Sequence, residues 1–257
     1  MPESVTPGAT AGSQPKPWTK VDITHHLARA CGYRSYLEVC TITTGNRYAE
    51  IDPSLFDPCH RLMYRCPDDY SDGLPIDFRS RSLNIARCLR AIRRRKLRYD
   101  IILLDPWHLY DTSYRDMTAA LRMVADDGAV LVHDCRPLSE EIASPDFRPG
   151  EWCGLTYKAY VDFVITHDYL RYFTVDTDYG CGLIFNRPRP PLLQRWFGAR
   201  PALSEERERL FSDWRACGND YKRIYRFFDD NHRALLNLVS VDEFVRMKIL
   251  GAGRGRK

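Results

Sequence analysis

Four side chains suited to proton transfer or cation binding follow two apolar stretches of the chain. Asp105 ends the run YDIILLD, and His108 comes three residues later. His133 and Asp134 end the run AVLVHD. An imidazole titrates near neutral pH, and a carboxylate at the end of a buried strand needs a cation, a donor or a metal beside it. If the two runs are neighbouring strands, these residues can act together on one substrate.

Each of the four also has a structural explanation. Asp105 can cap the helix that follows it, and His108 can form a structural hydrogen bond to Asp116 or to the backbone. Trp107 and Tyr110 can line a pocket or simply pack on the same helix. The functional interpretation therefore depends on whether the fold brings the polar residues to one place.

Apolar periodicity divides most of the chain into alternating helices and strands. It predicts helices over 21–31, 83–97, 113–125 and 157–167, and strands over 35–39, 60–66, 99–105 and 129–134, with two more strands within 171–185. The strands are apolar throughout, as in parallel sheets that helices cover on both faces. The sequence predicts an α/β fold with a doubly wound, Rossmann-like, mostly parallel sheet and an antiparallel edge hairpin. Ligands of such sheets bind where the carboxyl ends of the strands meet.

The composition changes after the last predicted strand, where the Pro-rich run RPRPPLLQRWF begins. We expect a flexible tail at 1–19, an α/β domain at 20–186 and a C-terminal helical extension at 187–257, with helices near 204–216, 220–231 and 241–250. Aromatic residues at helical spacing in the extension predict a docking face, either on the main domain or on a second copy in a homodimer: Trp214, Tyr221, Tyr225 and Phe228.

Composition argues against several classes of protein. The chain has 257 residues, 44% hydrophobic and 28% charged, and no apolar run approaches the roughly 20 residues of a membrane span. Its nine cysteines are scattered without a C-x-x-C pair, and no secretory signal is visible, so we expect reduced thiols and a cytoplasmic location. The net charge of +4 is mild, and RRRK is typical of a solvated helix end, so we expect no nucleic-acid binding.

The stretch YDIILLDPWHLYDTSYRDMTAALRMVADDGAVLVHDC resembles a pattern of class I S-adenosylmethionine-dependent methyltransferases, D-(L/I)-I-x-I-D-G-x-H-x-Y followed by a helix and a strand ending H-D. WCGLTYKAY and TVDTDYGCGLI are similar to segments of a bacterial branch associated with glycan and natural-product modification. The resemblance implies a transferase that uses S-adenosylmethionine, and Mg²⁺ in some relatives, to methylate a hydroxyl of a sugar or another small molecule.

The resemblance also assigns roles to residues. For the cofactor it implies Glu38, Thr41, Gly45, Asp68, Asp77 and Asp105. For catalysis we expect His108 as general base, because it follows Asp105 by three residues and an imidazole titrates near neutral pH, together with Asp105 and the family-matched Lys158. For the metal it implies Asp105 and Asp134, with His133 as a third ligand or a neighbour of the ligands. Lys158 can orient the substrate, pair with Asp134, or be a solvated helix cation. Asp176 and Asp178 can line the acceptor side or shape a hairpin turn.

The glycine-rich first motif of the family is altered in this chain. Cys40 stands where the family has a glycine, Gly45 is the one glycine left in the turn, and Pro106 replaces a glycine after Asp105. No nucleophile motif surrounds Cys40, so we expect it in the core. The alternative function is a degenerate methyltransferase-fold protein without methyl transfer that binds a glycan or a protein through its C-terminal helices.

Overall fold

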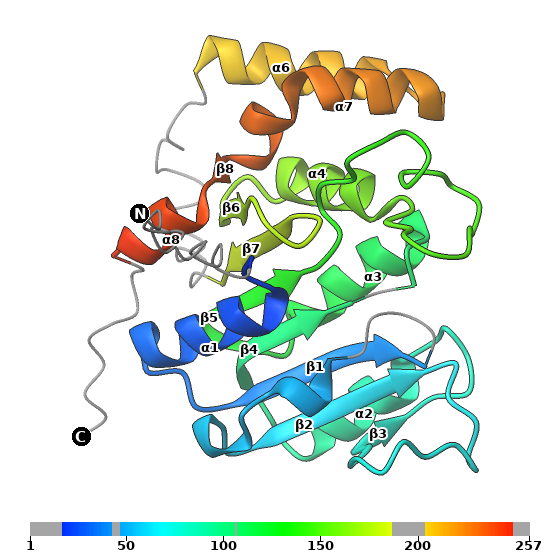
Figure 1. The fold of residues 1–257 in the computed structure, drawn as a ribbon, viewed down its shortest axis with the longest axis vertical. Coiled ribbons are helices and arrows are strands. Elements are labelled where there is room, and N and C mark those ends of the chain that lie inside the picture. The colour runs from blue at the N-terminus through cyan, green and yellow to red at the C-terminus, as the bar shows by residue number, and fades with distance from the viewer. Residues whose placement is uncertain (1–16, 43–46, 106, 187–203, 249–257) are drawn as a thin grey trace, which may run out of the picture.

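The computed structural model describes residues 17–42, 47–105, 107–186 and 204–248 (Figure 1). Gly45, Pro106 and the Pro-rich run lie outside these ranges. The helices are α1 (Lys20–Cys31), α2 (Ala86–Arg94), α3 (Tyr110–Ala120), α4 (Thr156–Thr166), α6 (Glu205–Ala216), α7 (Tyr221–Leu236) and α8 (Val241–Arg246), with two 3₁₀ turns, η1 (Tyr48–Glu50) and η2 (Pro53–Leu55). The strands are β1 (Tyr36–Thr41), β2 (Cys59–Tyr64), β3 (Phe78–Arg79), β4 (Tyr99–Leu104), β5 (Val124–Val132), β6 (Arg171–Val175), β7 (Cys181–Phe185) and β8 (Leu238–Val239).

The described strands form one sheet in the order β3-β2-β1-β4-β5-β7-β6-β8. Strands β1 to β5 pair in parallel, and β7 is antiparallel to both of its neighbours, β5 and β6. The predicted Rossmann-like sheet and its hairpin are therefore confirmed. The short β8 pairs in parallel with β6 and lies outside the hairpin, so the expected C-terminal extension contributes the outermost strand.

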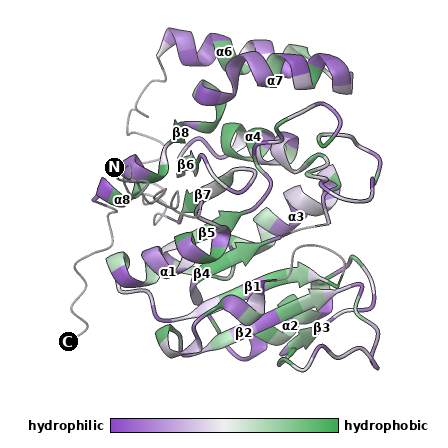
Figure 2. Ribbon diagram, in the orientation of Figure 1, coloured by the Kyte–Doolittle hydropathy of each residue, from purple (hydrophilic) through white to green (hydrophobic). Residues whose placement is uncertain are grey.

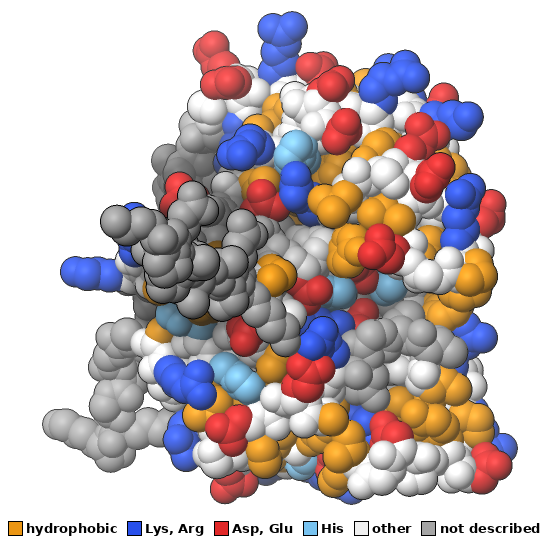
Figure 3. Space-filling model, viewed as in Figure 1, with side chains coloured by type: hydrophobic (Ala, Val, Ile, Leu, Met, Phe, Trp, Pro, Cys, Tyr) orange, Lys and Arg blue, Asp and Glu red, His pale blue; other side chains and the backbone are white. Residues whose placement is uncertain are grey.

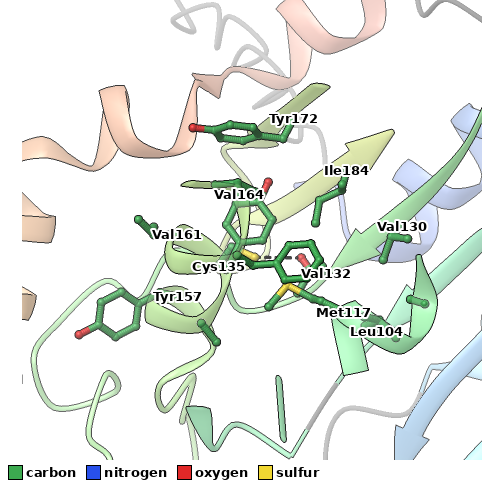
Figure 4. Close-up of a cluster of buried hydrophobic side chains, with 14 of the residues drawn as sticks. Leu104, Met117, Val130, Val132, Cys135, Tyr157, Val161, Val164, Tyr172 and Ile184 are labelled. Atoms are coloured by element: carbon green, nitrogen blue, oxygen red, sulfur yellow. Dashed lines mark hydrogen bonds between the residues drawn. The ribbon is translucent and has the colours of Figure 1, made fainter. Parts of the chain in front are cut away.

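Helices cover both faces of the sheet, which explains why its strands are apolar throughout. One face carries α2, α3 and α4, and its core includes Val130 and Val132 of β5, which pack with Met117 and Val164 (Figure 4). The other face carries α1 and α8, whose Phe244 is fully buried. Figure 2 shows the hydrophobic strands between helices whose outer surfaces are hydrophilic.

The border between α3 and β5 lies earlier than predicted. The helix ends at Ala120 instead of 125, and β5 begins at Val124 instead of 129. Val124 pairs with Tyr99, after which the register between β4 and β5 shifts. Residues 126–128, which the prediction left between the helix and the strand, belong to an irregular stretch of β5, in which Asp127 has a φ of 63°.

The C-terminal helices α6 and α7 lie over α4 (Figure 1). The indole N–H of Trp214 donates to Asp162 of α4 at 2.6 Å, and the rings of Phe228 and Tyr157 have centroids 4.7 Å apart. Of the two alternatives for the aromatic residues of this segment, the structure shows docking on the main domain. Tyr221 is the exception, because 43% of it is exposed.

Asp116 of α3 gives a testable pH dependence of stability. Its side chain is buried, its Oδ2 has no hydrogen-bond partner, and burial raises its pKa from 3.8 to about 7. The folded state therefore holds a proton that the unfolded state releases between these values, so Asp116 makes the protein less stable as pH rises.

Asp116→Asn is expected to remove this slope, which is at most about 1.4 kcal/mol per pH unit. Urea unfolding at pH 5 and pH 8 should show the variant gaining stability over the wild type at the higher pH. Asp111→Asn, at an exposed position of the same helix, is the control. Equal pH dependence in the Asp116 variant and the wild type would contradict the assignment.

Candidate active site

The structure brings Asp105, His108, His133 and Asp134 together at the carboxyl ends of β4 and β5. Nε2 of His108 lies 3.0 Å from Oδ2 of Asp134 and 3.4 Å from Oδ1 of Asp105. Nδ1 of His133 lies 3.1 Å from the same Asp134 oxygen and 3.8 Å from Oδ1 of Asp105. All four residues are buried. The convergence that the strand ends predicted is present in the fold.

Hydrogen bonds between neighbouring strands fix the backbone positions of Asp105 and His133. The Asp105 amide donates to a carbonyl of β1 at 3.0 Å, and the His133 amide donates to a carbonyl of β4 at 2.9 Å. Asp134 has a left-handed backbone with a φ of 61°, which ends the extended strand. Its two carboxylate oxygens contact different partners, since Oδ2 faces both histidines and Oδ1 accepts a hydrogen bond from the Cys153 thiol at 3.3 Å.

The loop before α4 holds the His108 ring in place. Nδ1 of His108 donates to the Trp152 carbonyl, and the indole of Trp152 lies against the imidazole with ring centroids 5.1 Å apart. Gly154 has a φ of 54°, and a Cβ there would come within 2.3 Å of the His108 carbonyl oxygen. Glycine at 154 permits this close approach, so the loop fixes both the backbone and the ring of His108.

Two residues from distant parts of the chain complete the cluster. Nζ of Lys20, the first residue of α1, lies 2.8 Å from Oδ2 of Asp105, and its backbone N–H donates to Oδ2 of Asp178 at 2.8 Å. The same Asp178 oxygen is 3.2 Å from Nε2 of His133. The side chain of Lys20 is 3% exposed and that of Asp178 is 19% exposed, so the cluster reaches the surface at Asp178. In Figure 3, histidine and acidic side chains are visible together in the middle of this face.

The charges of the cluster depend on one another. Burial by itself raises the pKa of Asp105, but Lys20 and the two histidines lower it well below its ordinary value. The same holds for Asp134. Burial raises its pKa, but His133 and His108 together lower the pKa by more. Both carboxylates are therefore ionised at neutral pH.

The opposite shifts occur at the basic groups. Burial lowers the pKa of His108, but Asp134 and Asp105 raise it to about 9. Asp134 likewise outweighs burial at His133, whose pKa is raised well above its ordinary value. The pKa of Lys20 is also raised against the effect of burial, chiefly by Asp105. In spite of burial, the pKa of Asp178 is lowered by His133. At neutral pH the cluster thus holds three positively charged side chains and three carboxylates.

The His133 ring is the least satisfied member. Carboxylate oxygens lie within ion-pair distance of both ring nitrogens, yet neither nitrogen has a hydrogen bond of acceptable geometry in the described structure. A buried polar group without a partner costs free energy that a ligand can recover. His133 therefore marks the side of the cluster from which a ligand group can be held.

Two of the residues expected at the cofactor lie in β1. Glu38 is buried within the strand, three residues before its end, where it accepts a hydrogen bond from the Tyr36 hydroxyl at 2.9 Å. Burial raises its pKa to about 7. Thr41 is the last residue of β1 and is also buried, next to residues 43–46, which include Gly45 and are outside the described structure.

Asp68 and Asp77 are not brought to the carboxyl ends of β1, β4 and β5. Asp68 is exposed and pairs with Arg81. Asp77 accepts a hydrogen bond from the Arg61 amide at 2.8 Å. Arg61 lies three residues before the carboxyl end of β2. The stretch between them is instead organised by Asp72, which binds the fully buried Arg61 guanidinium through both carboxylate oxygens at 2.7 and 2.8 Å.

Lys158 is not brought to the cluster either. Its Nζ lies 2.6 Å from Oδ2 of Asp162 on the same helix and 4.5 Å from the centre of the Tyr110 ring. The possible pairing with Asp134 is therefore wrong, because an acid one helical turn away is the nearer partner. Asp176 pairs with Arg136 at 2.5 Å, so of the two acids near the hairpin turn only Asp178 faces the cluster.

Cys40 lies in the core, as expected. It is fully buried in a small apolar cluster with Met63 and Cys66, between β1 and β2. Its side chain packs against those of Met63 and Cys66. The residue that replaces the family's glycine is therefore part of the apolar core.

Comparison with known proteins gives similarity of fold only. No family model matches the chain, and no curated protein matches it significantly. Among solved structures, it is similar to the O-methyltransferase TomG from Streptomyces achromogenes, involved in tomaymycin synthesis and solved with SAM, with 15% identity, a TM-score of 0.45 and coverage of 65% of this chain and 78% of that one.

Two other solved structures show the same level of similarity. An O-methyltransferase from Bacillus cereus, solved with SAH, is 14% identical over 66% of this chain and 82% of that one, with a TM-score of 0.42. MycE, a methyltransferase of the mycinamycin pathway solved with Mg, SAH and mycinamycin VI, is 17% identical over 66% of this chain and 50% of that one, with a TM-score of 0.40. These values are too low to assign a function, which must come from the residues of this chain.

Proposed function

We propose that this protein is an S-adenosylmethionine-dependent methyltransferase that acts on a hydroxyl of a sugar or another small molecule. The observation that carries the proposal is the cluster of Asp105, His108, His133 and Asp134. These residues belong to the stretch that resembles the methyltransferase family, and the fold joins them where an α/β sheet binds its ligands.

Several of the described residues could contact a cofactor at the carboxyl ends of the strands. Thr41 closes β1 with a hydroxyl, the Cys40 side chain is buried in an apolar cluster, and the two ring nitrogens of His133 lack well-aligned hydrogen bonds to the carboxylates beside them. Asp68 and Asp77, the acids expected near the cofactor, contact Arg81 and the Arg61 amide in the described structure. We therefore assign the cofactor to the carboxyl ends of β1 and β4 without naming a ribose ligand.

The bound cofactor would supply a methyl group on a positively charged sulfur. Methyl transfer is a displacement in line with the bond that breaks, so the protein aligns the acceptor and accepts its proton. His108 suits this role because its ring is fixed by the Trp152 carbonyl and Gly154. Its raised pKa requires that the neutral form act as the base, with Asp134, 3.0 Å away, holding the imidazolium that forms.

A divalent cation is the less supported part of the proposal. The structure offers a possible set of three ligands, whose ligand atoms lie within 4.8 Å of one another: Asp105, His108 and Asp134. Carboxylate oxygens suit Mg²⁺. The sequence predicted His133 as the possible third ligand, in place of His108. However, Lys20 neutralises Asp105, and the histidines carry protons that a ligating imidazole must lose. The residues fit a metal by position and not by charge, so we assign it no step.

Two further features belong to the proposal. The similarity of WCGLTYKAY and TVDTDYGCGLI to natural-product and glycan-modifying relatives points to an acceptor of that chemistry. All nine cysteines are free thiols, which suits a reducing compartment such as the cytoplasm. Within the described residues, no helix has the length and apolarity that crossing a bilayer requires.

A binding protein without methyl transfer is the second candidate, and one cavity favours it. The cavity measures about 490 Å³ and lies between the loop around Ser144 and the amino end of α7. It is lined by Tyr221 and Tyr225, with Glu140 and Arg148 nearby. Tyrosine faces beside charged hydrogen-bonding groups suit a sugar ring, and none of the lining residues belongs to the cluster.

Calorimetry with S-adenosylhomocysteine, with and without Mg²⁺, separates the two candidates. The methyltransferase proposal predicts saturable heat with the wild type in metal-free buffer. Thr41→Val, which removes the hydroxyl at the end of β1, should weaken binding about tenfold, as expected for one lost hydrogen bond. Thr118→Val, on α3, is the matched control and should bind like the wild type. No heat with the wild type would leave the binding protein as the better account.

A further inference from the structure

Lys20 occupies an unusual place for a lysine. It is the first residue of α1, it is 2% exposed, and it contacts two carboxylates at once, Asp105 through its ammonium and Asp178 through its backbone N–H. Its own carbonyl accepts a hydrogen bond from the Thr24 hydroxyl at 2.8 Å, which ties the residue into the helix. A buried lysine with this many fixed contacts is part of the site and not a solvated side chain.

The chain directly before α1 is anchored at Trp18, two residues before Lys20. The Trp18 carbonyl accepts a hydrogen bond from the Thr177 hydroxyl, which precedes Asp178 in the hairpin turn. The Trp18 ring packs against Phe244 of α8, with ring centroids 6.4 Å apart. The ammonium is therefore delivered to Asp105 by a segment that is itself anchored.

The position of Nζ matters because Asp105 is shared. Asp105, His108 and Asp134 are the residues whose ligand atoms lie close enough for one metal ion. Nζ of Lys20 already lies 2.8 Å from Oδ2 of this Asp105. A divalent ion bound to the same carboxylate would be a few ångströms from the ammonium in a site with little water, and the two positive charges would repel each other strongly.

We propose that Lys20 is the resident cation of this cluster, and that it takes the place beside Asp105 that a divalent metal would need. The wild-type cluster then holds no metal, and removing the lysine charge creates a metal site from Asp105, His108 and Asp134. The inference goes beyond the proposed methyl transfer, since it concerns only the charges of the cluster and holds whether or not the cofactor binds.

Titration with Mn²⁺ tests the inference without cofactor or acceptor. Free Mn²⁺ is measured by electron paramagnetic resonance as the ion is added to the full-length protein. The wild type is expected to leave the ion free at millimolar concentration. Lys20→Met, which keeps the length of the side chain and removes its charge, is expected to bind one Mn²⁺ at least tenfold more tightly, and the double variant with Asp105→Asn should lose that gain.

Two controls isolate the charge of Lys20. Lys20→Arg keeps a cation and should reject Mn²⁺ like the wild type. Lys158→Met removes a lysine that is paired with Asp162, away from the cluster, and should gain nothing. If Lys20→Met is unfolded in metal-free buffer, recovery of its folded circular dichroism spectrum on adding Mn²⁺ counts as the same gain.

The opposite results overturn the inference. Wild-type protein that binds Mn²⁺ as tightly as Lys20→Met would show that the lysine does not hold the metal's place. A Lys20→Met protein that Mn²⁺ neither binds nor refolds would show that the cluster is no latent metal site. Neither result bears on methyl transfer, which the calorimetry with S-adenosylhomocysteine tests separately.

Discussion

His108→Gln is expected to lower the rate of methyl transfer by a factor on the order of 10² to 10⁴, the usual contribution of a general base. Glutamine can keep a polar group near Asp134 but cannot accept the proton of the acceptor hydroxyl. S-adenosylhomocysteine binding should change little, since His108 serves the acceptor. The rate is measured as S-adenosylhomocysteine released with the best acceptor found among phenols and glycosides.

His167→Gln is the matched control for this variant. His167 follows α4, and its Nδ1 hydrogen-bonds to the Phe163 carbonyl at 2.8 Å, away from the cluster. This control should retain the wild-type rate. A His108→Gln protein with the wild-type rate would remove His108 from the mechanism, and one that lost cofactor binding in the same proportion as rate would make it a binding residue instead.

Asp72→Asn is expected to produce a large loss of stability, although the residue lies away from the cluster. Arg61 is fully buried in β2, and Asp72 holds its guanidinium with two short hydrogen bonds. Without the negative charge, the buried cation keeps only neutral acceptors, which are the Pro75 and Leu74 carbonyls and the one amide oxygen of the substituted side chain. Breaking such a pair costs on the order of 3 kcal/mol, which denaturant unfolding at neutral pH would detect.

Asp68→Asn provides the comparison, because it changes an aspartate in the same stretch of chain. Asp68 pairs with Arg81, and both side chains are more than half exposed. Exposed pairs contribute little to stability, so this variant should unfold at the same denaturant concentration as the wild type. Similar losses in the two variants would mean that Asp72 does not compensate the charge of Arg61.

The convergence of polar residues at one edge of the sheet could be predicted from strand periodicity. Asp105, His133 and Asp134 come directly after apolar strands, and parallel strands end at one edge. The arrangement of the sheet follows from the same pattern. A two-residue strand such as β3 or β8 is too short to give any periodic signal, and neither was predicted.

The contacts that the sequence missed come from distant segments or from choices between nearby partners. Lys20 and Asp105 are 85 residues apart, and only the presence of a lysine in the first turn of a helix, where a cation is unfavourable, hinted at a buried partner. Lys158 had a visible partner in Asp162, four residues on, which the family pattern obscured. The stretch with Asp68 and Asp77 folds around Arg61, a need that local pattern does not reveal.

We propose above all that the cofactor binds at the carboxyl ends of β1 and β4, beside the cluster formed by Asp105, His108, His133 and Asp134. It is tested most directly by the imidazole ¹⁵N resonances of the seven histidines as S-adenosylhomocysteine is added to the wild type. We predict saturable shifts of the His108 and His133 resonances. The resonances of His167, at the end of α4, and His232, in α7, should stay unchanged. Saturation that leaves the resonances of His108 and His133 in place would contradict the claim, because the ligand would then bind elsewhere.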